Sequence, residues 1–285
     1  MPSTTAPSLT DVLAAARETL ARAGVDEASR EALRLWADLA GEPRGRALLR
    51  RDAPVSEAHV RRFREAVARR AGGEPLAYVT GRAGFRHLEL RCDRRALIPR
   101  PETEGLVEFA LARVRTGIAA DIGVGTGCVA LSLRQEGAFR AVVGVDLSAG
   151  ALELARENAV ETGLAVSWVR GDLVTPLGDA CVDLLVSNPP YLTEGEWAGL
   201  DAGVKAWEPA LALRSGADGL AATRRLLDDG RRVVAAGGWI ALEIDMARAA
   251  DAAALAHGAG WRHVAVERDL FGRERYLLAQ RSERS

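Results

Sequence analysis

The sequence predicts an α/β fold: a doubly wound, mostly parallel sheet preceded by a small helical bundle and a β-hairpin. From about residue 96, apolar runs that suit buried strands alternate with segments whose apolar residues recur at helical spacing. That alternation is typical of strand–helix units built around a parallel sheet. Before residue 74 the spacing is helical throughout. A chain of 285 residues, 48% of them hydrophobic, is long enough for one full-size domain and a small one.

Residues 1–74 are expected to form the helical bundle. Helices are predicted over residues 9–23, 27–40 and 56–71, with Ser8, Asp26 and Ser56 as their N-caps. Glycines that follow the second and third of these segments, Gly41 and Gly72-Gly73, are typical helix stops.

Residues 75–95 are expected to form a β-hairpin that links the bundle to the larger domain. Two short alternating runs, Tyr78–Thr80 and Leu88–Arg91, are separated by a turn that contains glycine. Such a pattern predicts two antiparallel strands. Residues 96–285 would then form the α/β domain.

A glycine-rich turn follows the first strand predicted in that domain. The run Gly117–Ala120 ends at Asp121, and Gly123, Gly125 and Gly127 follow at alternate positions. Glycines let the backbone approach a ligand closely and adopt positive φ. The spacing differs from that of a dinucleotide fingerprint or a P-loop, and the leading carboxylate would repel a pyrophosphate. The turn therefore suits an uncharged or cationic ligand.

The next two predicted strands also end near acids. The run from Ala141 closes on Asp146, roughly twenty residues after the glycines, which is the usual position for an acid that binds ribose hydroxyls. The run Ala165–Val169 leads to Asp172, which can accept from an exocyclic amine, and to Leu173, which can pack on a base. Each acid alone is more often a helix cap or a loop residue. Their order on successive strands indicates a nucleoside pocket.

The tetrapeptide Asn188-Pro189-Pro190-Tyr191 follows the apolar run Val182–Val186. It should therefore lie at the carboxyl end of a strand, where open α/β sheets bind ligands. Proline fixes its own φ and restricts the residue before it, so Asn188 can hold its side-chain oxygen and a backbone carbonyl towards one point. Two acceptors that converge there suit the two hydrogens of a substrate –NH2 group.

These motifs, in this order, resemble those of class I S-adenosylmethionine methyltransferases that act on amino nitrogens. Within that class the chain is similar to the release factor glutamine methyltransferase family. Further parts of that family's signature stand at Pro75–Gly81, Leu97–Glu104, Glu208–Leu213 and Asp269–Arg273. The resemblance covers about residues 75–280. The chain departs from the pattern at Asp245, where the family normally has glycine.

The resemblance implies a seven-stranded sheet, S-adenosylmethionine as cofactor, and the glutamine N5 of the Gly-Gly-Gln motif in peptide chain release factors as methyl acceptor. It implies cofactor binding by Asp121, Gly123, Val124, Gly125, Thr126, Gly127, Asp146, Asp172, Leu173 and Asn188. It implies substrate binding by Asn188, Pro189, Pro190 and Tyr191, with Asn188, Pro189 and Tyr191 catalytic. The loop with Arg100, Pro101 and Thr103 is expected near the cofactor's methionine end. Residues 1–74, which lack cofactor motifs, are expected to dock the release factor.

Two other functions remain open at this stage. In methylation of nucleic acid amino groups, adenine N6 or guanine N2, the Asn-Pro-Pro-Tyr motif would bind the –NH2 group in the same way. Extruded bases need stacking aromatics, however, and only 5% of residues are aromatic. A non-catalytic S-adenosylmethionine-binding module is the third candidate, although the intact Asn188–Tyr191 motif argues against it.

Charge and cysteine content exclude several classes. The formal net charge of −1 gives no global attraction to nucleic acid. Three unclustered cysteines and four scattered histidines indicate neither disulfides nor a metal site. No signal peptide or membrane span is evident, so a cytoplasmic monomer is expected. Nine arginines between Arg44 and Arg70 form either a solvated helix face or a docking surface for an acidic partner.

Overall fold

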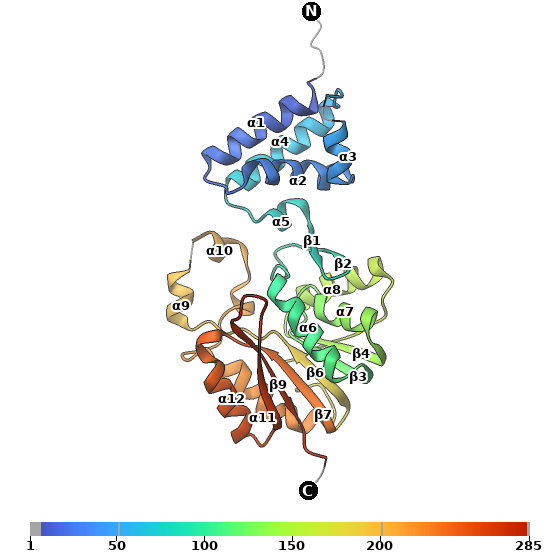
Figure 1. The fold of residues 1–285 in the computed structure, drawn as a ribbon, viewed down its shortest axis with the longest axis vertical. Coiled ribbons are helices and arrows are strands. Elements are labelled where there is room, and N and C mark those ends of the chain that lie inside the picture. The colour runs from blue at the N-terminus through green and yellow to red at the C-terminus, as the bar shows by residue number, and fades with distance from the viewer. Residues whose placement is uncertain (1–6, 51, 201, 284–285) are drawn as a thin grey trace, which may run out of the picture. The chain divides into compact units, whose positions relative to one another are not determined.

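The computed structural model describes residues 7–50, 52–200 and 202–283. The chain divides between Arg82 and Ala83 into two compact units, which are drawn in Figure 1. Each unit has its own apolar core.

The N-terminal unit is a bundle of helices. Its helices are α1 (Leu9–Arg22), α2 (Ala28–Ala40), α3 (Arg44–Leu49), α4 (Glu57–Ala71) and α5 (Leu76–Thr80). Helices α1, α2 and α4 lie side by side (Figure 1). Their core includes the fully buried Leu20 and Leu35 and the edge-to-face pair of Trp36 and Phe63, whose ring centroids are 5.3 Å apart. This unit confirms the predicted bundle and adds α3, a six-residue helix without a side-chain cap.

Two of the three predicted N-caps are confirmed. The hydroxyls of Ser8 and Ser56 accept from the backbone N–H groups of Asp11 and His59. The prediction for Asp26 is wrong: the N-cap is Glu27, with a φ of 51° and no side-chain capping bond. The carbonyl of Glu27 accepts the first helical hydrogen bonds, so the left-handed turn at this residue starts α2.

The first predicted hairpin strand is also wrong. Residues Tyr78–Thr80 lie in α5, and the hairpin pairs β1 (Arg82–Phe85) with β2 (Leu88–Arg91). The guanidinium of Arg69, on α4, donates to the backbone carbonyls of Tyr78 at 3.2 Å and Val79 at 3.5 Å. These bonds satisfy carbonyls at the end of α5 that have no partner within the helix. The composition of Tyr78–Thr80 favours a strand, but it does not include the contact with Arg69, which lies in another helix.

The C-terminal unit is built on a seven-stranded sheet, which confirms the predicted doubly wound class. Its strands are β3 (Thr116–Ile122), β4 (Ala138–Asp146), β5 (Ser167–Arg170), β6 (Val182–Ser187), β7 (Val234–Glu243), β8 (Arg262–Arg268) and β9 (Glu274–Gln280). They lie in the order β5-β4-β3-β6-β7-β9-β8. Strands β3 to β7 pair in parallel, and β9 is antiparallel to both its neighbours.

Helices cover both faces of this sheet. The longer ones are α6 (Pro101–Arg113), α7 (Cys128–Glu136), α8 (Ala149–Thr162), α11 (Ala221–Val233) and α12 (Ala249–Gly258), and two short ones are α9 (Glu194–Gly199) and α10 (Ala202–Trp207). Successive strand residues alternate between two cores: Leu184 packs with α6 and α7, and Leu185 packs with α11 and α12. Figure 1 shows these pairs of helices on opposite sides of the sheet.

Candidate active site

A cavity of about 520 Å³ lies at the C-terminal ends of β3, β4 and β6. Its volume falls in the range typical of small-molecule sites. Many of the predicted site residues line it: Asp121, Gly123, Val124, Gly125, Thr126, Asp146, Asp172, Leu173, Asn188 and Pro190. Gly127, Pro189 and Tyr191 are not among the lining residues. Gly127 starts α7 at a φ of 84°, and a Cβ there would lie 3.1 Å from the side chains of Ala155 and Trp168.

Asp121 is buried beneath the glycine-rich turn, with 2% of its surface exposed. Its Oδ2 accepts from the backbone N–H of Ala130 at 3.0 Å, in the first turn of α7. Burial raises the pKa of Asp121 to about 7, although this hydrogen bond favours the charged form. The carboxylate therefore anchors the helix that follows the turn.

We expect Asp121→Asn to stabilise the protein more at pH 8 than at pH 5. The folded pKa lies above the unfolded one, so this carboxyl's favourable contribution is present below pH 3.8 and is lost as the pH rises through about 7. Asparagine keeps the acceptor for Ala130 and carries no charge. Thermal unfolding at both pH values should show a Tm gain at pH 8 that exceeds the gain at pH 5 by at least about 2 °C. Equal gains would contradict the raised pKa.

Asp146 connects the glycine-rich turn to the loop after β4. Its Oδ2 accepts from the backbone N–H of Gly125 at 3.0 Å, and its Oδ1 accepts from that of Ser148 at 2.8 Å. Partial burial raises the pKa of Asp146. A carboxylate offers about four acceptor sites, so both oxygens can still accept from ligand hydroxyls.

Asp172 and Leu173 also line the cavity. The carboxylate of Asp172 pairs with the guanidinium of Arg225, on α11, at 3.1 and 2.9 Å. Sequence reasoning missed Arg225, which lies 53 residues further along the chain. This exposed pair contributes little to stability, but it holds the carboxylate in place at the cavity.

Asn188 belongs to a chain of polar side chains at the cavity. Its Nδ2 donates to Thr103 Oγ1 at 3.0 Å, and the hydroxyl of Thr103 donates to Glu243 Oε2 at 2.7 Å. Among the described residues, Asn188 Oδ1 has no hydrogen-bond partner. Burial raises the pKa of Glu243 to about 7, against the opposing effects of the Thr103 hydrogen bond and the nearby Arg275. Sequence reasoning placed Thr103 near the site and missed Glu243.

A second ion pair joins two of the signature segments. Arg100 Nη2 lies 2.6 and 2.7 Å from the two carboxylate oxygens of Glu208, which is itself buried. Arg100, Thr103 and Pro209 all line the cavity. The segments Leu97–Glu104 and Glu208–Leu213 therefore meet at the cavity wall.

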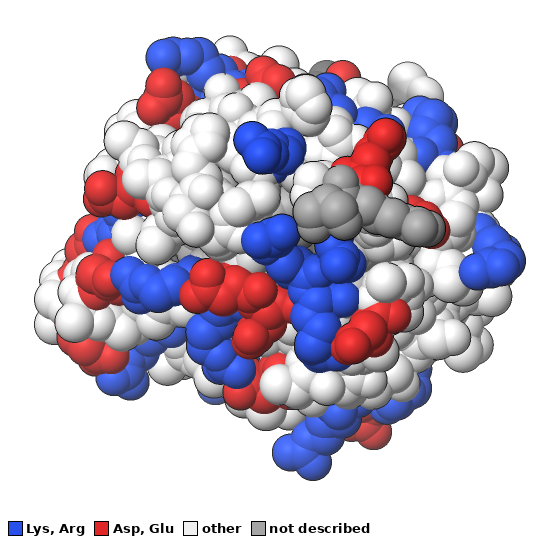
Figure 2. Space-filling model, turned by 90° about the horizontal axis from the view of Figure 1, so that it is seen from below, with Lys and Arg blue, Asp and Glu red and all other residues white. Residues whose placement is uncertain are grey.

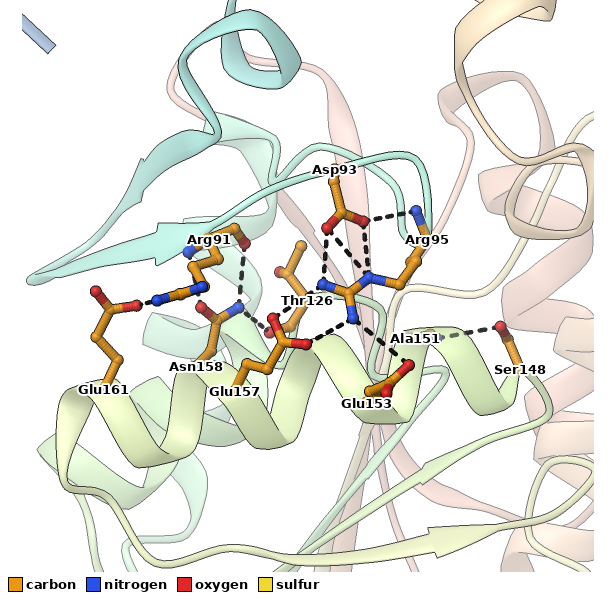
Figure 3. A network of polar contacts seen from close by, with 10 residues as sticks. All are labelled: Arg91, Asp93, Arg95, Thr126, Ser148, Ala151, Glu153, Glu157, Asn158 and Glu161. Carbon is orange, nitrogen blue, oxygen red and sulfur yellow. Dashed lines mark hydrogen bonds and ion pairs between the residues drawn. The ribbon is translucent and has the colours of Figure 1, made fainter. Parts of the chain in front are cut away.

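Asn158, on α8, ties the glycine-rich turn to the end of the hairpin (Figure 3). Its Nδ2 donates to the backbone carbonyls of Thr126 and Arg91 at 2.9 and 3.1 Å, and its Oδ1 accepts from the Arg91 N–H at 2.7 Å. Nearby, Arg95 pairs with Asp93 and with Glu157 at 2.7 Å each. Sequence reasoning missed Asn158 because an asparagine within a helix carries no motif of its own.

The loop after β7 accommodates Asp245 without strain. Its φ is −73°, so glycine is not needed there, and its side chain accepts from the backbone N–H of Ala247 at 2.7 Å.

Within the described residues, no helix is long and apolar enough to cross a membrane. The same residues contain no cluster of three His, Cys, Asp or Glu side chains that could hold a metal ion.

The sequence matches two known families: the PrmC N-terminal domain over residues 11–81 and the Methyltransferase small domain over residues 103–203. Similar proteins include three named release factor glutamine methyltransferase. That of Nitratidesulfovibrio vulgaris is 38% identical over 98% of this chain and 97% of its own length. The protein of Deinococcus radiodurans is 39% identical over 96% of this chain and 99% of its own length. The protein of Mycolicibacterium smegmatis is 40% identical over 97% of this chain and 99% of its own length.

The sheet also resembles that of solved proteins. A methyltransferase from Pyrococcus furiosus superposes with a TM-score of 0.51 at 18% identity, over 69% of this chain and 90% of its own. At that identity the likeness concerns the fold alone.

Proposed function

The chain belongs to the release factor glutamine methyltransferase family, and from this premise we propose that it transfers a methyl group from S-adenosylmethionine to the N5 of the Gly-Gly-Gln glutamine in peptide chain release factors. The observation that carries the proposal is Asn188, whose amide nitrogen is engaged by Thr103 while its oxygen remains available at the cavity. An acceptor held in this way suits the N–H groups of a substrate amide.

The cavity wall supports S-adenosylmethionine as the methyl donor. Asp146 has acceptor capacity for two vicinal hydroxyls, and the turn at Gly123 and Gly125 has positive φ, which brings backbone rather than side chain to the cavity. Asp172 and Leu173 would contact the adenine. When bound, S-adenosylmethionine supplies an electrophilic methyl group on a sulfonium.

The residues of the Asn-Pro-Pro-Tyr motif would orient the glutamine. An amide nitrogen is a poor nucleophile because its lone pair is delocalised into the carbonyl. Asn188 Oδ1 and the Pro189 carbonyl would accept its two hydrogens, and these bonds strengthen as positive charge develops on nitrogen. Tyr191 would pack beside the amide and exclude water. Alignment of this kind can lower the barrier by roughly 7–11 kcal/mol when it is good.

We also propose a division of labour along the chain. Residues 1–74 would dock the release factor, and residues 96–285 would transfer the methyl group. Residues 75–95 would link these two parts of the chain. Within the bundle, Arg70 pairs with Glu31 at 2.6 Å, whereas Arg61, Arg62 and Arg64 are exposed on α4. Such a surface suits an acidic protein partner. Acting on release factors would place the enzyme in the cytoplasm, and we propose that it acts there as a monomer.

Methyl transfer to nucleic acid is the alternative that an experiment should distinguish from methyl transfer to a release factor. On the face drawn in Figure 2, described Lys and Arg side chains lie next to Asp and Glu side chains. Mixed charge of this kind does not favour binding of a phosphate backbone at this face, because such a backbone is bound mainly by clustered cations.

The test uses S-adenosylmethionine with a labelled methyl group and the full-length protein. A release factor, a release factor whose motif glutamine is replaced by glutamate, RNA and DNA are offered in parallel. We expect label only on the first, located at the motif glutamine by peptide mass spectrometry. Label on RNA or DNA, with none on the release factor, would establish nucleic acid methylation instead.

A further inference from the structure

Three side chains from three separate elements form one hydrogen-bonded chain behind the substrate position. Glu243 is the last residue of β7, Thr103 lies in the first turn of α6, and Asn188 follows β6 directly. Glu243 and Thr103 are 1% and 3% exposed. The two hydrogen bonds, of 2.7 and 3.0 Å, therefore lie largely out of water, where such bonds are electrostatically stronger.

The chemistry of these groups sets the direction of the chain. Above its pKa of about 7 Glu243 is ionised and can only accept, and a threonine hydroxyl has one proton. Once Thr103 donates that proton to Glu243, its oxygen can only accept from Asn188. The Asn188 amide must then present its –NH2 to Thr103 and its oxygen elsewhere. With the opposite orientation, Asn188 would offer N–H groups to a substrate that needs acceptors.

Surrounding contacts hold Glu243 and the turn that carries Thr103. Glu243 Oε1 lies 3.8 Å from Arg275 Nη1, and Arg275 Nε lies 3.1 Å from Asp269 Oδ2. The Tyr276 hydroxyl, on β9, donates to the backbone carbonyl of Glu102. This bond fixes the first turn of α6 against the sheet, directly beside Thr103.

We propose that Glu243 and Thr103 are positioning residues, which orient the Asn188 amide so that its Oδ1 accepts from the –NH2 of the substrate glutamine. They act through Asn188, although Thr103 also lines the cavity. The inference rests on the proposed function, because it presumes that Asn188 binds the amide.

Thr103→Val tests the middle of the chain, since valine keeps the shape and removes the hydroxyl. On a release factor, kcat should fall by about 10- to 100-fold, the loss found when groups that orient metal-binding side chains are removed. KM and S-adenosylmethionine affinity, measured by calorimetry, should change less than threefold. Thr103→Ser restores the hydroxyl and should recover most of the lost kcat.

A double-mutant cycle separates positioning from direct contact. In an Asn188→Ala background, Thr103→Val should cause no further loss, because it acts only through Asn188. Independent losses, or a fall in S-adenosylmethionine affinity as large as that in kcat, would overturn the proposal. If instead Asn188→Ala alone retained wild-type kcat, the proposed function of Asn188 would fail, which is a distinct outcome.

Glu243→Gln tests the end of the chain. Unlike an ionised carboxylate, glutamine can either accept from Thr103 or donate to it, and when it donates, the hydroxyl proton is free for Asn188 and favours the wrong amide orientation. We expect kcat to fall by about the same factor as in Thr103→Val, with no loss of thermal stability. Wild-type kcat in a folded Glu243→Gln protein would show that the carboxylate does not orient Asn188.

Discussion

Asn188→Ala is expected to lower kcat on a release factor by about 10²–10³-fold or more, the loss typical of removing a preorganised group that stabilises developing charge. The Asn188 acceptor would favour the transition state over the bound substrate, so S-adenosylmethionine affinity should change far less. Single-turnover kinetics and calorimetry on the same preparation measure both quantities.

Asn188→Asp provides the matched control for that prediction. Aspartate keeps an acceptor but cannot donate to Thr103, whose one proton already serves Glu243. We therefore expect it to remain as impaired as the alanine variant. A reduction in kcat of less than tenfold in Asn188→Ala would show that Asn188 does not hold the amide.

Asp146→Ala is expected to weaken S-adenosylmethionine binding by about 1.5–3 kcal/mol, the usual worth of hydrogen bonds to a charged group. Asp146 also accepts from the backbone N–H groups of Gly125 and Ser148, so part of the loss would come from a less ordered turn. Calorimetry gives the affinity, and circular dichroism should show that the sheet is retained.

Asp179→Ala is the matched control, because Asp179 is an exposed acid that pairs with Arg232 and does not line the cavity. The Asp179→Ala variant should bind S-adenosylmethionine with the affinity of the wild type. Wild-type affinity in Asp146→Ala as well would mean that Asp146 is an ordinary acid at a strand end.

The parts of the site predicted from sequence are those in which residue type and local order suffice. Asp121, Asp146 and Asn188 follow apolar runs, and parallel strands bring their carboxyl ends to one edge of the sheet. The partners that orient these residues could not be predicted in this way. Thr103 lies 140 residues from Glu243 and 85 from Asn188, and only the strand order brings them together.

The errors in the fold have the same origin. Tyr78–Thr80 has the composition of a strand, and a guanidinium from another helix decides otherwise. Helix α3 is short and follows Pro43 without a side-chain cap, so the local signal for its start is weak. In both cases tertiary contacts outweigh weak local preferences.

Asn158 bonds to the backbone of both Arg91 and Thr126, so we expect it to couple the opening of the end of the hairpin to that of the glycine-rich turn. Amide protons on both segments should therefore exchange with solvent as one cooperative unit. A ligand that orders the turn would slow exchange at β2 as well, although β2 does not line the cavity. Binding of a ligand in the cavity would therefore also stabilise β2, the last strand before the seven-stranded sheet.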